Sequence, residues 1–272
     1  MVTFPNCKIN LGLHILQKRT DGYHNIETVF FPVPFYDALE INPSHENTTV
    51  FSNTGIPAGK EEDNLCMAAY HLLKKDFPTL PEINIHLHKA IPIGAGLGGG
   101  SADASFTLTL LNQTFNLELS PFRFFEYASM LGSDCSFFLF NKPCIATGRG
   151  ESMEVIKFSL SGYKILLINP GIHINTKETF QQVIPEIPKK QIKDIIQQPI
   201  ETWKHELIND FEKVVFPRYN EIKNLKENLY NHGAVYASMT GTGSTVFGIF
   251  NSKDKINFPI KKEYFQKEIY LP

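Results

Sequence analysis

The feature that most constrains this chain is a run of glycines between two segments of regular structure. Five of the seven residues from Gly94 to Gly100 are glycine, in the sequence GAGLGGG. The preceding segment, INIHLHK at 83–89, alternates apolar and polar side chains as a half-buried strand does. The following segment, SADASFTLTLLNQTF at 101–115, has apolar residues at the four-residue spacing of a helix face. The run therefore predicts a strand, a bare loop and a helix in succession.

A bare loop in front of a helix predicts a site for an anion. Glycine lets the backbone approach a ligand closely. The first N–H groups of a helix have no intrahelical partner and carry a partial positive charge. Together they form a phosphate cradle that needs no basic side chain. We expect Ser101 to cap the helix or meet a phosphate oxygen, and Lys89 to add positive charge.

Two common nucleotide-binding motifs do not fully match this segment. No Lys-Ser or Lys-Thr pair follows the last glycine, so this is not a Walker A loop. Gly94, Gly96 and Gly99 match the dinucleotide pattern G-x-G-x-x-G. However, the sequence KAIP separates the strand from the first glycine, and the acid at the right distance, Glu118, precedes a helix start. A tight strand-to-helix connection alone would need only one or two glycines.

Composition narrows the class of protein further. The 272 residues are 42% hydrophobic and 20% charged, which is enough for a buried core and unlike a disordered chain. The net charge of −2 gives no broad basic field, so we expect neither nucleic acid nor a membrane as partner. The four cysteines have no CxxC spacing, and the N-terminus lacks the apolar core of a signal peptide. These features favour free thiols and a cytoplasmic location.

The remaining patterns predict two domains. The expected elements of the first half are strands at 7–16, 25–35, 37–43 and 83–89, and helices at 63–77, 101–115 and 121–131. Pro32 and Pro34 place the far end of the second strand at an edge or exit. The second half is expected to have a buried strand at 163–170, helical pieces within 187–232 and two strand-like runs within 233–250. We place the boundary near residue 153, which gives domains 1–153 and 154–272.

Three stretches together resemble the GHMP small-molecule kinases. The segment PIGAGLGGGSA at 92–102 is similar to the phosphate loop of that family. NCKINLGLHILQKRTDGYHNIETVF near the N-terminus and ASMTGTGSTVFGIF near the C-terminus are similar to one branch of it. That branch phosphorylates a cytidine-diphosphate-linked methylerythritol in non-mevalonate isoprenoid synthesis. The three stretches occur in the expected order and span nearly the whole chain.

The resemblance implies an α+β fold with the two-domain GHMP-kinase architecture. Its N-terminal domain is ribosomal-protein-S5-domain-2-like, its C-terminal domain is ferredoxin-like, and the active site lies in the cleft between them. It also implies ATP as phosphate donor, with Mg²⁺ bound to ATP, and a cytidine diphospho sugar alcohol as the small-molecule substrate. No protein metal ligand is expected, and the protein is expected to be a monomer or a homodimer.

The resemblance assigns the chemistry to Lys8 in CKIN and Asp134 in GSDCS. The carboxylate of Asp134 would take the proton of the attacking hydroxyl. Lys8 would keep Asp134 ionised and stabilise the developing negative charge. Without the resemblance, a strand lysine would be read as exposed and an aspartate after Gly132 as part of a turn.

The resemblance also assigns the binding residues. The ATP site would consist of Asn64, Lys89, Pro92, Ile93, Gly94, Ala95, Gly96, Leu97, Gly98, Gly99, Gly100, Ser101 and Ala102. Asn64 has a competing role as a helix cap. Gly241 and Gly243 would bring a turn of the second domain close to the phosphates, or serve only a hairpin turn.

The cytidine ring would stack between Tyr23 and Phe180, and His24 would hydrogen-bond its edge. Asn10 and Thr176 would position the diphosphate or the polyol, and Phe30 would close the pocket. Core packing is the competing role for both phenylalanines, because the chain contains 22 of them.

Two stretches depart from the usual family pattern. GSDCS stands where Gly-Ala-Asp-Val-Pro is commoner, and SMTGTGS has threonines in place of serines. Three rival functions remain: a mevalonate, homoserine or galactose kinase, a nicotinamide oxidoreductase, and a nucleotide-binding regulator without catalysis.

Overall fold

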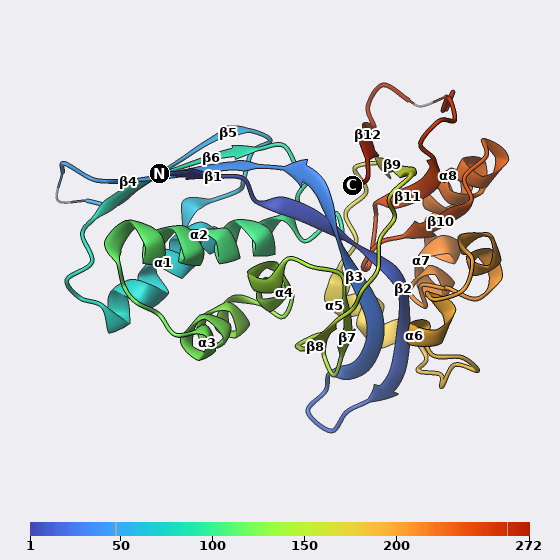
Figure 1. The fold of residues 1–272 in the computed structure, drawn as a ribbon, viewed down its shortest axis with the longest axis horizontal. Coiled ribbons are helices and arrows are strands. Elements are labelled where there is room, and N and C mark those ends of the chain that lie inside the picture. The colour runs from blue at the N-terminus through green and yellow to red at the C-terminus, as the bar shows by residue number, and fades with distance from the viewer. Residues whose placement is uncertain (47, 260) are drawn as a thin grey trace. The chain divides into compact units, whose positions relative to one another are not determined.

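A computed structural model describes residues 1–46, 48–259 and 261–272. Its contacts group the chain into two compact units, each made of several segments (Figure 1). Unit 1 comprises residues 1–7, 35–93 and 98–141, and unit 2 comprises residues 8–34, 94–97 and 142–272. The chain therefore passes between the units more than once. The expected boundary near residue 153 stays a prediction.

Unit 1 contains a four-stranded sheet with helices on one face (Figure 1). The strand order is β1 (Val2–Thr3), β4 (Ala38–Pro43), β6 (Ile83–Lys89) and β5 (Val50–Gly55). β6 pairs antiparallel with β4 and parallel with β5. The alternation read from the sequence is confirmed in β6, because Ile83, Ile85 and Leu87 are buried and the residues between them are more exposed.

The helices of unit 1 begin and end at residues that the sequence marks. They are η1 (Glu61–Asp63), α1 (Leu65–Asp76), α2 (Gly99–Phe115), α3 (Pro121–Leu131) and α4 (Cys135–Phe140). Asn64 caps α1, since its side chain accepts a hydrogen bond from the backbone N–H of Cys66. Ser120 caps α3 in the same way, and Pro121 occupies the first helical position, where no N–H is needed.

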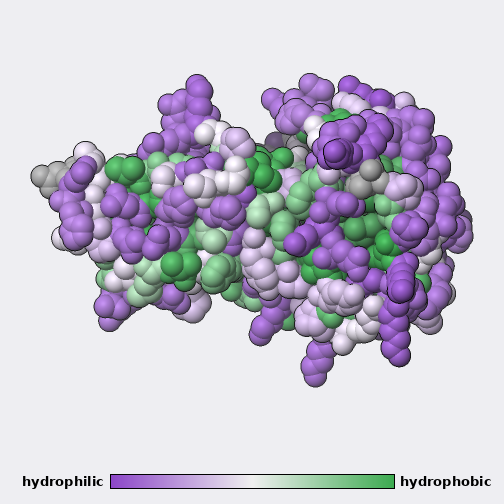
Figure 2. All heavy atoms as spheres, turned by 90° about the horizontal axis from the view of Figure 1, so that it is seen from above, coloured by the Kyte–Doolittle hydropathy of each residue, from purple (hydrophilic) through white to green (hydrophobic). Residues whose placement is uncertain are grey.

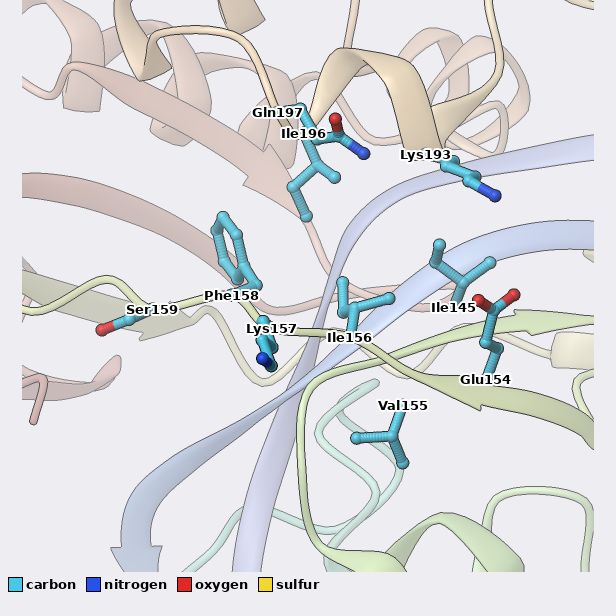
Figure 3. A pocket seen from close by; sticks show the side chains of 10 residues that line it. All are labelled: Ile145, Glu154, Val155, Ile156, Lys157, Phe158, Ser159, Lys193, Ile196 and Gln197. Atoms are coloured by element: carbon cyan, nitrogen blue, oxygen red, sulfur yellow. The ribbon is translucent and has the colours of Figure 1, made fainter.

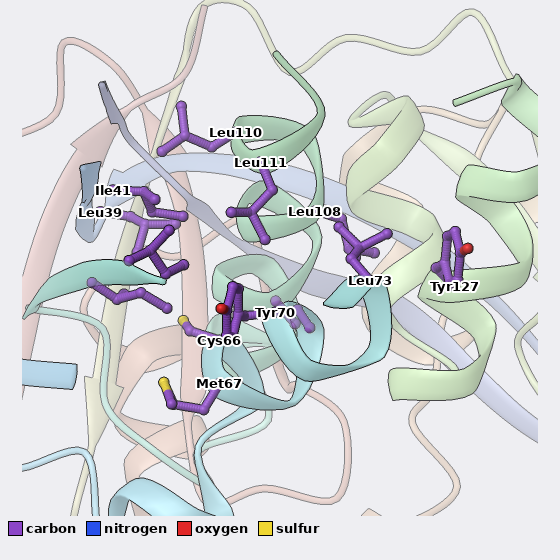
Figure 4. Close-up of a cluster of buried hydrophobic side chains, with 14 of the residues drawn as sticks. Leu39, Ile41, Cys66, Met67, Tyr70, Leu73, Leu108, Leu110, Leu111 and Tyr127 are labelled. Carbon is purple, nitrogen blue, oxygen red and sulfur yellow. The ribbon is translucent and has the colours of Figure 1, made fainter. Parts of the chain in front are cut away.

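The core of unit 1 lies between this sheet and helices α1 and α2. Figure 4 shows Leu39 and Ile41 of β4 near Cys66 and Tyr70 of α1, with leucines of α2 completing the cluster. Burying each such side chain contributes about 1.5–3 kcal/mol relative to exposure. This packing fixes both α2 and the end of β6, between which the glycine run lies.

Unit 2 contains most of a second sheet, with the order β2 (Asn6–Lys18), β3 (His24–Tyr36), β7 (Cys144–Thr147) and β8 (Ser152–Val155). β2 begins in unit 1 and β3 ends there. The predicted turn at Asp21-Gly22 joins the two strands, and Gly22 has a φ of +85° that favours glycine. β7 pairs with β3 only at Thr28–Phe30, so Pro32 and Pro34 lie beyond that pairing, as expected.

The other sheet of unit 2 has the order β10 (Tyr236–Met239), β11 (Val246–Asn251), β9 (Tyr163–Asn169) and β12 (Phe265–Tyr270). Neighbouring strands in this order pair antiparallel. The central strand β9 is almost entirely buried, as its apolar sequence predicts. The helices of this unit are α5 (Thr176–Gln182), α6 (Ile192–Ile195), η2 (Ile200–His205), α7 (Glu212–Arg218) and α8 (Asn220–Asn231).

The α+β character expected from the sequence is confirmed by these sheets and helices. In the part of the chain that the structure describes, no helix is long and apolar enough to cross a membrane. Figure 2 shows hydrophilic side chains over much of the face in view.

Candidate active site

Asn10 is the centre of a buried hydrogen-bond network in unit 2. Its side-chain oxygen accepts from Lys8 Nζ at 2.7 Å and from the backbone N–H of Gly241 at 3.0 Å. Its side-chain nitrogen donates to Thr28 Oγ1 at 2.9 Å. Lys8 and Asn10 are only 3% and 1% exposed. The network therefore positions the Lys8 ammonium. Lys8 is a buried strand residue and not a solvent-exposed one.

The turn after β10 meets the first part of the glycine run, also within unit 2. The hydroxyl of Thr240 donates to the carbonyl of Gly96 at 3.0 Å. A Cβ on Gly96 would lie 2.2 Å from the carbonyl oxygen of Thr240, and one on Gly241 would lie 3.2 Å from Gly96 Cα. Both glycines have positive φ, so a side chain there would be strained as well as crowded. These two glycines permit the close backbone approach.

Two further residues hold this turn, and sequence reasoning missed them. Asn209 is fully buried, and its amide donates to the carbonyls of Met239 at 2.8 Å and Gly241 at 2.9 Å. Glu212 accepts from the N–H of Met239 at 2.9 Å. The only local signal is the polar sequence NDFE, which does not indicate contacts about 30 residues away.

The proposed cytidine-binding residues are aromatic side chains of unit 2. The ring of His24 stacks on that of Phe180, with centroids 5.5 Å apart. Burial, and then the charge of Lys18, lowers the pKa of His24, so its ring is neutral at pH 7. Tyr23 is 57% exposed, and the Arg149 guanidinium lies 4.9 Å from its ring centroid. The ring of Phe180 thus contacts His24 and also Phe211, whose ring centroid lies 4.7 Å away.

The other expected substrate residues occupy two different environments. Phe30 is 2% exposed, and Lys8 Nζ lies 4.8 Å from its ring centroid, so the ring makes a cation–π contact with the ammonium. Thr176 is exposed at the start of α5, and its hydroxyl is 3.1 Å from that of Thr242. This places Thr176 beside the turn that contains Gly241 and Gly243.

The backbone of the glycine run has the geometry of an anion-binding nest. φ is +62° at Gly94, +77° at Gly96 and +69° at Gly98, so left-handed residues alternate with others. Such alternation turns successive N–H groups toward one side. α2 then begins at Gly99 without any side-chain cap, and the N–H groups of its first turn have no intrahelical partner. Ser101 lies inside the helix, so the expectation that it caps the helix was wrong. The carbonyl of Gly98 accepts from Ala102 N at 2.9 Å, which starts the helix.

Lys89 lies in a buried cluster of ion pairs. Its side chain is 2% exposed, and its ammonium makes ion pairs with Asp37 and Asp103. The ammonium is thus directed at two carboxylates, and the expected local supply of positive charge by Lys89 stays a prediction. The sequence could not show this pairing, since Asp37 lies 52 residues away along the chain.

Asn64 and Asp134 of unit 1 each directly precede a helix. The predicted helix cap at Asn64 is confirmed, and its role at the nucleotide stays a prediction. Asp134 precedes α4, but its side chain makes no capping hydrogen bond. The expected ATP-binding set is completed by Pro92, Ile93, Gly100 and Ser101 of unit 1 and by Ala95 and Leu97 of unit 2. Their contact with ATP is likewise a prediction.

An open pocket of about 540 Å³ lies elsewhere in unit 2 (Figure 3). Residues 154–159 form one wall, and Lys193, Ile196 and Gln197 face them. None of the expected site residues lines it. It therefore adds nothing to the phosphoryl-transfer chemistry.

Two family models match separate parts of the chain. The model described as "GHMP kinases N terminal domain" matches residues 64–142, which include the glycine run and Asp134. The model described as "GHMP kinases C terminal" matches residues 191–258, which include Asn209 and the turn at Gly241.

Curated relatives match almost the whole chain. One from Bacteroides fragilis, named 4-diphosphocytidyl-2-C-methyl-D-erythritol kinase, is 49% identical over 94% of each chain. A relative of the same name from Cytophaga hutchinsonii is 52% identical over 93% of each chain. The chain belongs to this family of GHMP kinases.

Solved structures agree with this membership. A crystal structure of 4-(cytidine 5'-diphospho)-2C-methyl-D-erythritol kinase matches with a TM-score of 0.78 and 29% identity, covering 91% of this chain and 89% of the other. A mevalonate kinase matches with a TM-score of 0.72, but at 14% identity it shows only the shared fold. The two-domain GHMP-kinase fold expected from the sequence is thereby confirmed, and the chain is a small-molecule kinase that uses ATP.

Proposed function

We propose that this GHMP kinase transfers the γ-phosphoryl group of ATP to the 2-hydroxyl of 4-diphosphocytidyl-2-C-methyl-D-erythritol, in non-mevalonate isoprenoid synthesis. The names of relatives at 49% and 52% identity support the substrate. The observation that carries the ATP half is the alternation of positive φ at Gly94, Gly96 and Gly98 directly before α2. Such a backbone presents N–H groups to phosphate oxygens without basic side chains.

The proposed chemistry needs few protein groups, since phosphoryl transfer depends mostly on positioning and charge neutralisation. The substrate oxygen bonds to the γ-phosphorus, the bond to the bridging oxygen breaks, and ADP leaves. Asp134 takes the hydroxyl proton. Lys8, held by Asn10 at 2.7 Å, stabilises the negative charge that develops.

Mg²⁺ fits this site as a companion of ATP. Among the described residues, no group of three or more His, Cys, Asp or Glu side chains could hold a metal ion. Mg²⁺ commonly keeps several waters and binds through substrate phosphates rather than in a dedicated protein cage. It would neutralise phosphate charge when bound. The cytoplasmic location is part of the proposal too, supported by four buried free cysteines.

A coupled ADP-release assay tests the function directly. We expect turnover with 4-diphosphocytidyl-2-C-methyl-D-erythritol and none above background with mevalonate or homoserine. CDP and CMP should compete with the substrate, since a cytidine pocket recognises both. If the protein turned over mevalonate and CDP did not inhibit this, mevalonate would replace the proposed substrate. If the protein bound ATP but phosphorylated none of these alcohols, the proposed kinase activity would be excluded.

A further inference from the structure

Three buried charges lie where β6 ends and α2 begins, and the proposed chemistry uses none of them. Lys89 is the last residue of β6, Asp103 is in α2, and Asp37 lies between β3 and β4. Their side chains are 2%, 4% and 0% exposed. Lys89 Nζ donates to Asp103 Oδ2 at 2.7 Å and also to Asp37 Oδ2.

Stability alone does not account for such a cluster. Removing charges from water costs several kcal/mol per ion, and apolar residues of similar volume are often at least as stable. The cluster also has an uneven balance, with one ammonium for two carboxylates. Asp103 Oδ1 has no hydrogen-bond partner among the described residues. A costly arrangement at this position suggests a role in placing neighbouring backbone.

The cluster contacts the glycine-rich segment at both of its ends within unit 1. Asp37 Oδ1 accepts from the N–H of Ala90 at 2.6 Å and of Ile91 at 2.9 Å, where the chain leaves β6. At the other end, a Cβ on Gly99 would lie 2.9 Å from Lys89 Nζ. Lys89 therefore packs directly behind the first residue of α2, where a Cβ at position 99 would crowd its ammonium.

We propose that Asp37, Lys89 and Asp103 form a positioning cluster that holds the start of α2 against the end of β6, so that the N–H groups of residues 98–101 are aligned for the phosphates of ATP. The proposal rests on the ATP site proposed above. Lys89 acts through the backbone, because its ammonium is directed to two carboxylates. It is a positioning residue and not a phosphate ligand.

The charge state of Asp103 gives the cluster a measurable signature. Burial raises the pKa of Asp103 to about 7, although Lys89 acts in the opposite direction; the charge of Asp37 adds to the rise. Cys66 of α1 also interacts with Asp103, and burial raises the pKa of its thiol to about 12, so that it stays neutral. Ionisation of Asp103 above pH 7 adds negative charge behind the helix start, which weakens the binding of an anion.

Two substitutions separate positioning from direct phosphate binding. We expect Lys89→Met and Asp37→Asn each to raise KM for ATP by about tenfold. Lys89→Met leaves two buried carboxylates without their cation, and Asp37→Asn removes one of the two carboxylates that hold Lys89. KM for the cytidine substrate should change by less than about twofold in both, because the unit 2 network is untouched. Asp76→Asn, which removes a half-exposed ion pair with Arg123 in the same unit, is the matched control and should leave both KM values unchanged. If Lys89 bound phosphate directly, Asp37→Asn would free its ammonium and lower KM for ATP, which would overturn the proposal.

Asp103→Asn supplies a test that does not depend on a destabilised variant. Asparagine imitates the protonated acid, so this variant should match the wild type at pH 6. At pH 8.5 the wild type should have a KM for ATP several-fold above that of Asp103→Asn. Comparing the two proteins cancels the titration of ATP itself, and identical pH profiles would overturn the proposal. If the wild type does not turn over the cytidine substrate, the proposed function fails separately. The cluster is then tested by calorimetry, which compares the Kd of a nonhydrolysable ATP analogue between the same variants and pH values.

Discussion

The two units stabilise the glycine-rich segment with two different kinds of buried polar network. In unit 2, amides and hydroxyls around Asn10 hold Lys8, Thr240 and the carbonyl of Gly96. In unit 1, three charged side chains hold the end of β6 and the start of α2. The first network depends on hydrogen-bond geometry, and the second depends on charge balance.

This difference has consequences for how each network responds to change. The amides and hydroxyls of the unit 2 network do not titrate, so the network keeps its geometry over a wide pH range. The loss of its central residue leaves several groups unpaired at once. A charged cluster with an odd carboxylate changes state with pH even when no atom is removed. Substitutions in the two units should therefore differ in size and in pH dependence.

The largest expected effect comes from the proposed base in unit 1. We expect Asp134→Asn to lower kcat by about 10²–10⁴-fold, because general base catalysis is lost while the backbone site for ATP remains. The Kd of a nonhydrolysable ATP analogue should stay nearly unchanged. Asp194→Asn, at an exposed aspartate of α6, is the control. Turnover near that of the wild type would remove Asp134 from the role of base.

The next effect comes from Asn10, at the centre of the unit 2 network. Asn10→Leu removes hydrogen bonds to Lys8, Gly241 and Thr28 in a site that is 1% exposed. Each unpaired buried group costs about 1–3 kcal/mol, so we expect kcat/KM to fall by roughly 10²–10³-fold at every pH between 6 and 9. Asn112→Leu, which removes an amide at the end of α2, controls for the loss of a capping hydrogen bond. A loss that is equal in both variants would mean that the Asn10 network has no special role.

The sequence predicted the parts of this site that are local in the chain. The glycine run, the helix start after it and the cap at Asn64 all depend on neighbouring residues, and the structure contains each of them. The strands β1 and β5 were not predicted, because they are short, lie at sheet edges and lack a clear apolar alternation.

Partners that are distant in sequence were beyond such reasoning. The interaction of Asn10 with Thr240 joins residues 230 apart, and that of Lys89 with Asp37 joins residues 52 apart. Residue type alone suggested a phosphate ligand at Lys89, whereas the fold places two carboxylates on it. Burial and pairing decide what a lysine does, and neither can be read from its neighbours in the chain.

A smaller effect separates the two networks by pH. The folded-state pKa of Asp103 is raised from 3.8 to about 7, so the wild type loses stability as pH rises through that interval. Three pKa units correspond to at most about 4 kcal/mol, and coupling to Lys89 reduces the effect. We therefore expect Asp103→Asn to become more stable relative to the wild type as the pH rises from 5 to 8. The measurement is the free energy of unfolding of each protein from urea denaturation. For Asn10→Leu, the difference in free energy of unfolding from the wild type should be the same at both pH values. If this difference were also constant for Asp103→Asn, the raised pKa of Asp103 would be contradicted.

The smallest effect is expected at the exposed edge of unit 2, away from both networks. Tyr23 is 57% exposed and touches Arg149, so Tyr23→Ala should disturb neither the fold nor the Asn10 network. Loss of base stacking costs about 1–3 kcal/mol, which predicts a rise in KM for the cytidine substrate of roughly tenfold with KM for ATP unchanged. Tyr36→Ala, at another exposed tyrosine, is the matched control. An unchanged KM in Tyr23→Ala would leave the stacked pair of His24 and Phe180 as the aromatic surface for the base, because that pair already lies at 5.5 Å in the folded chain.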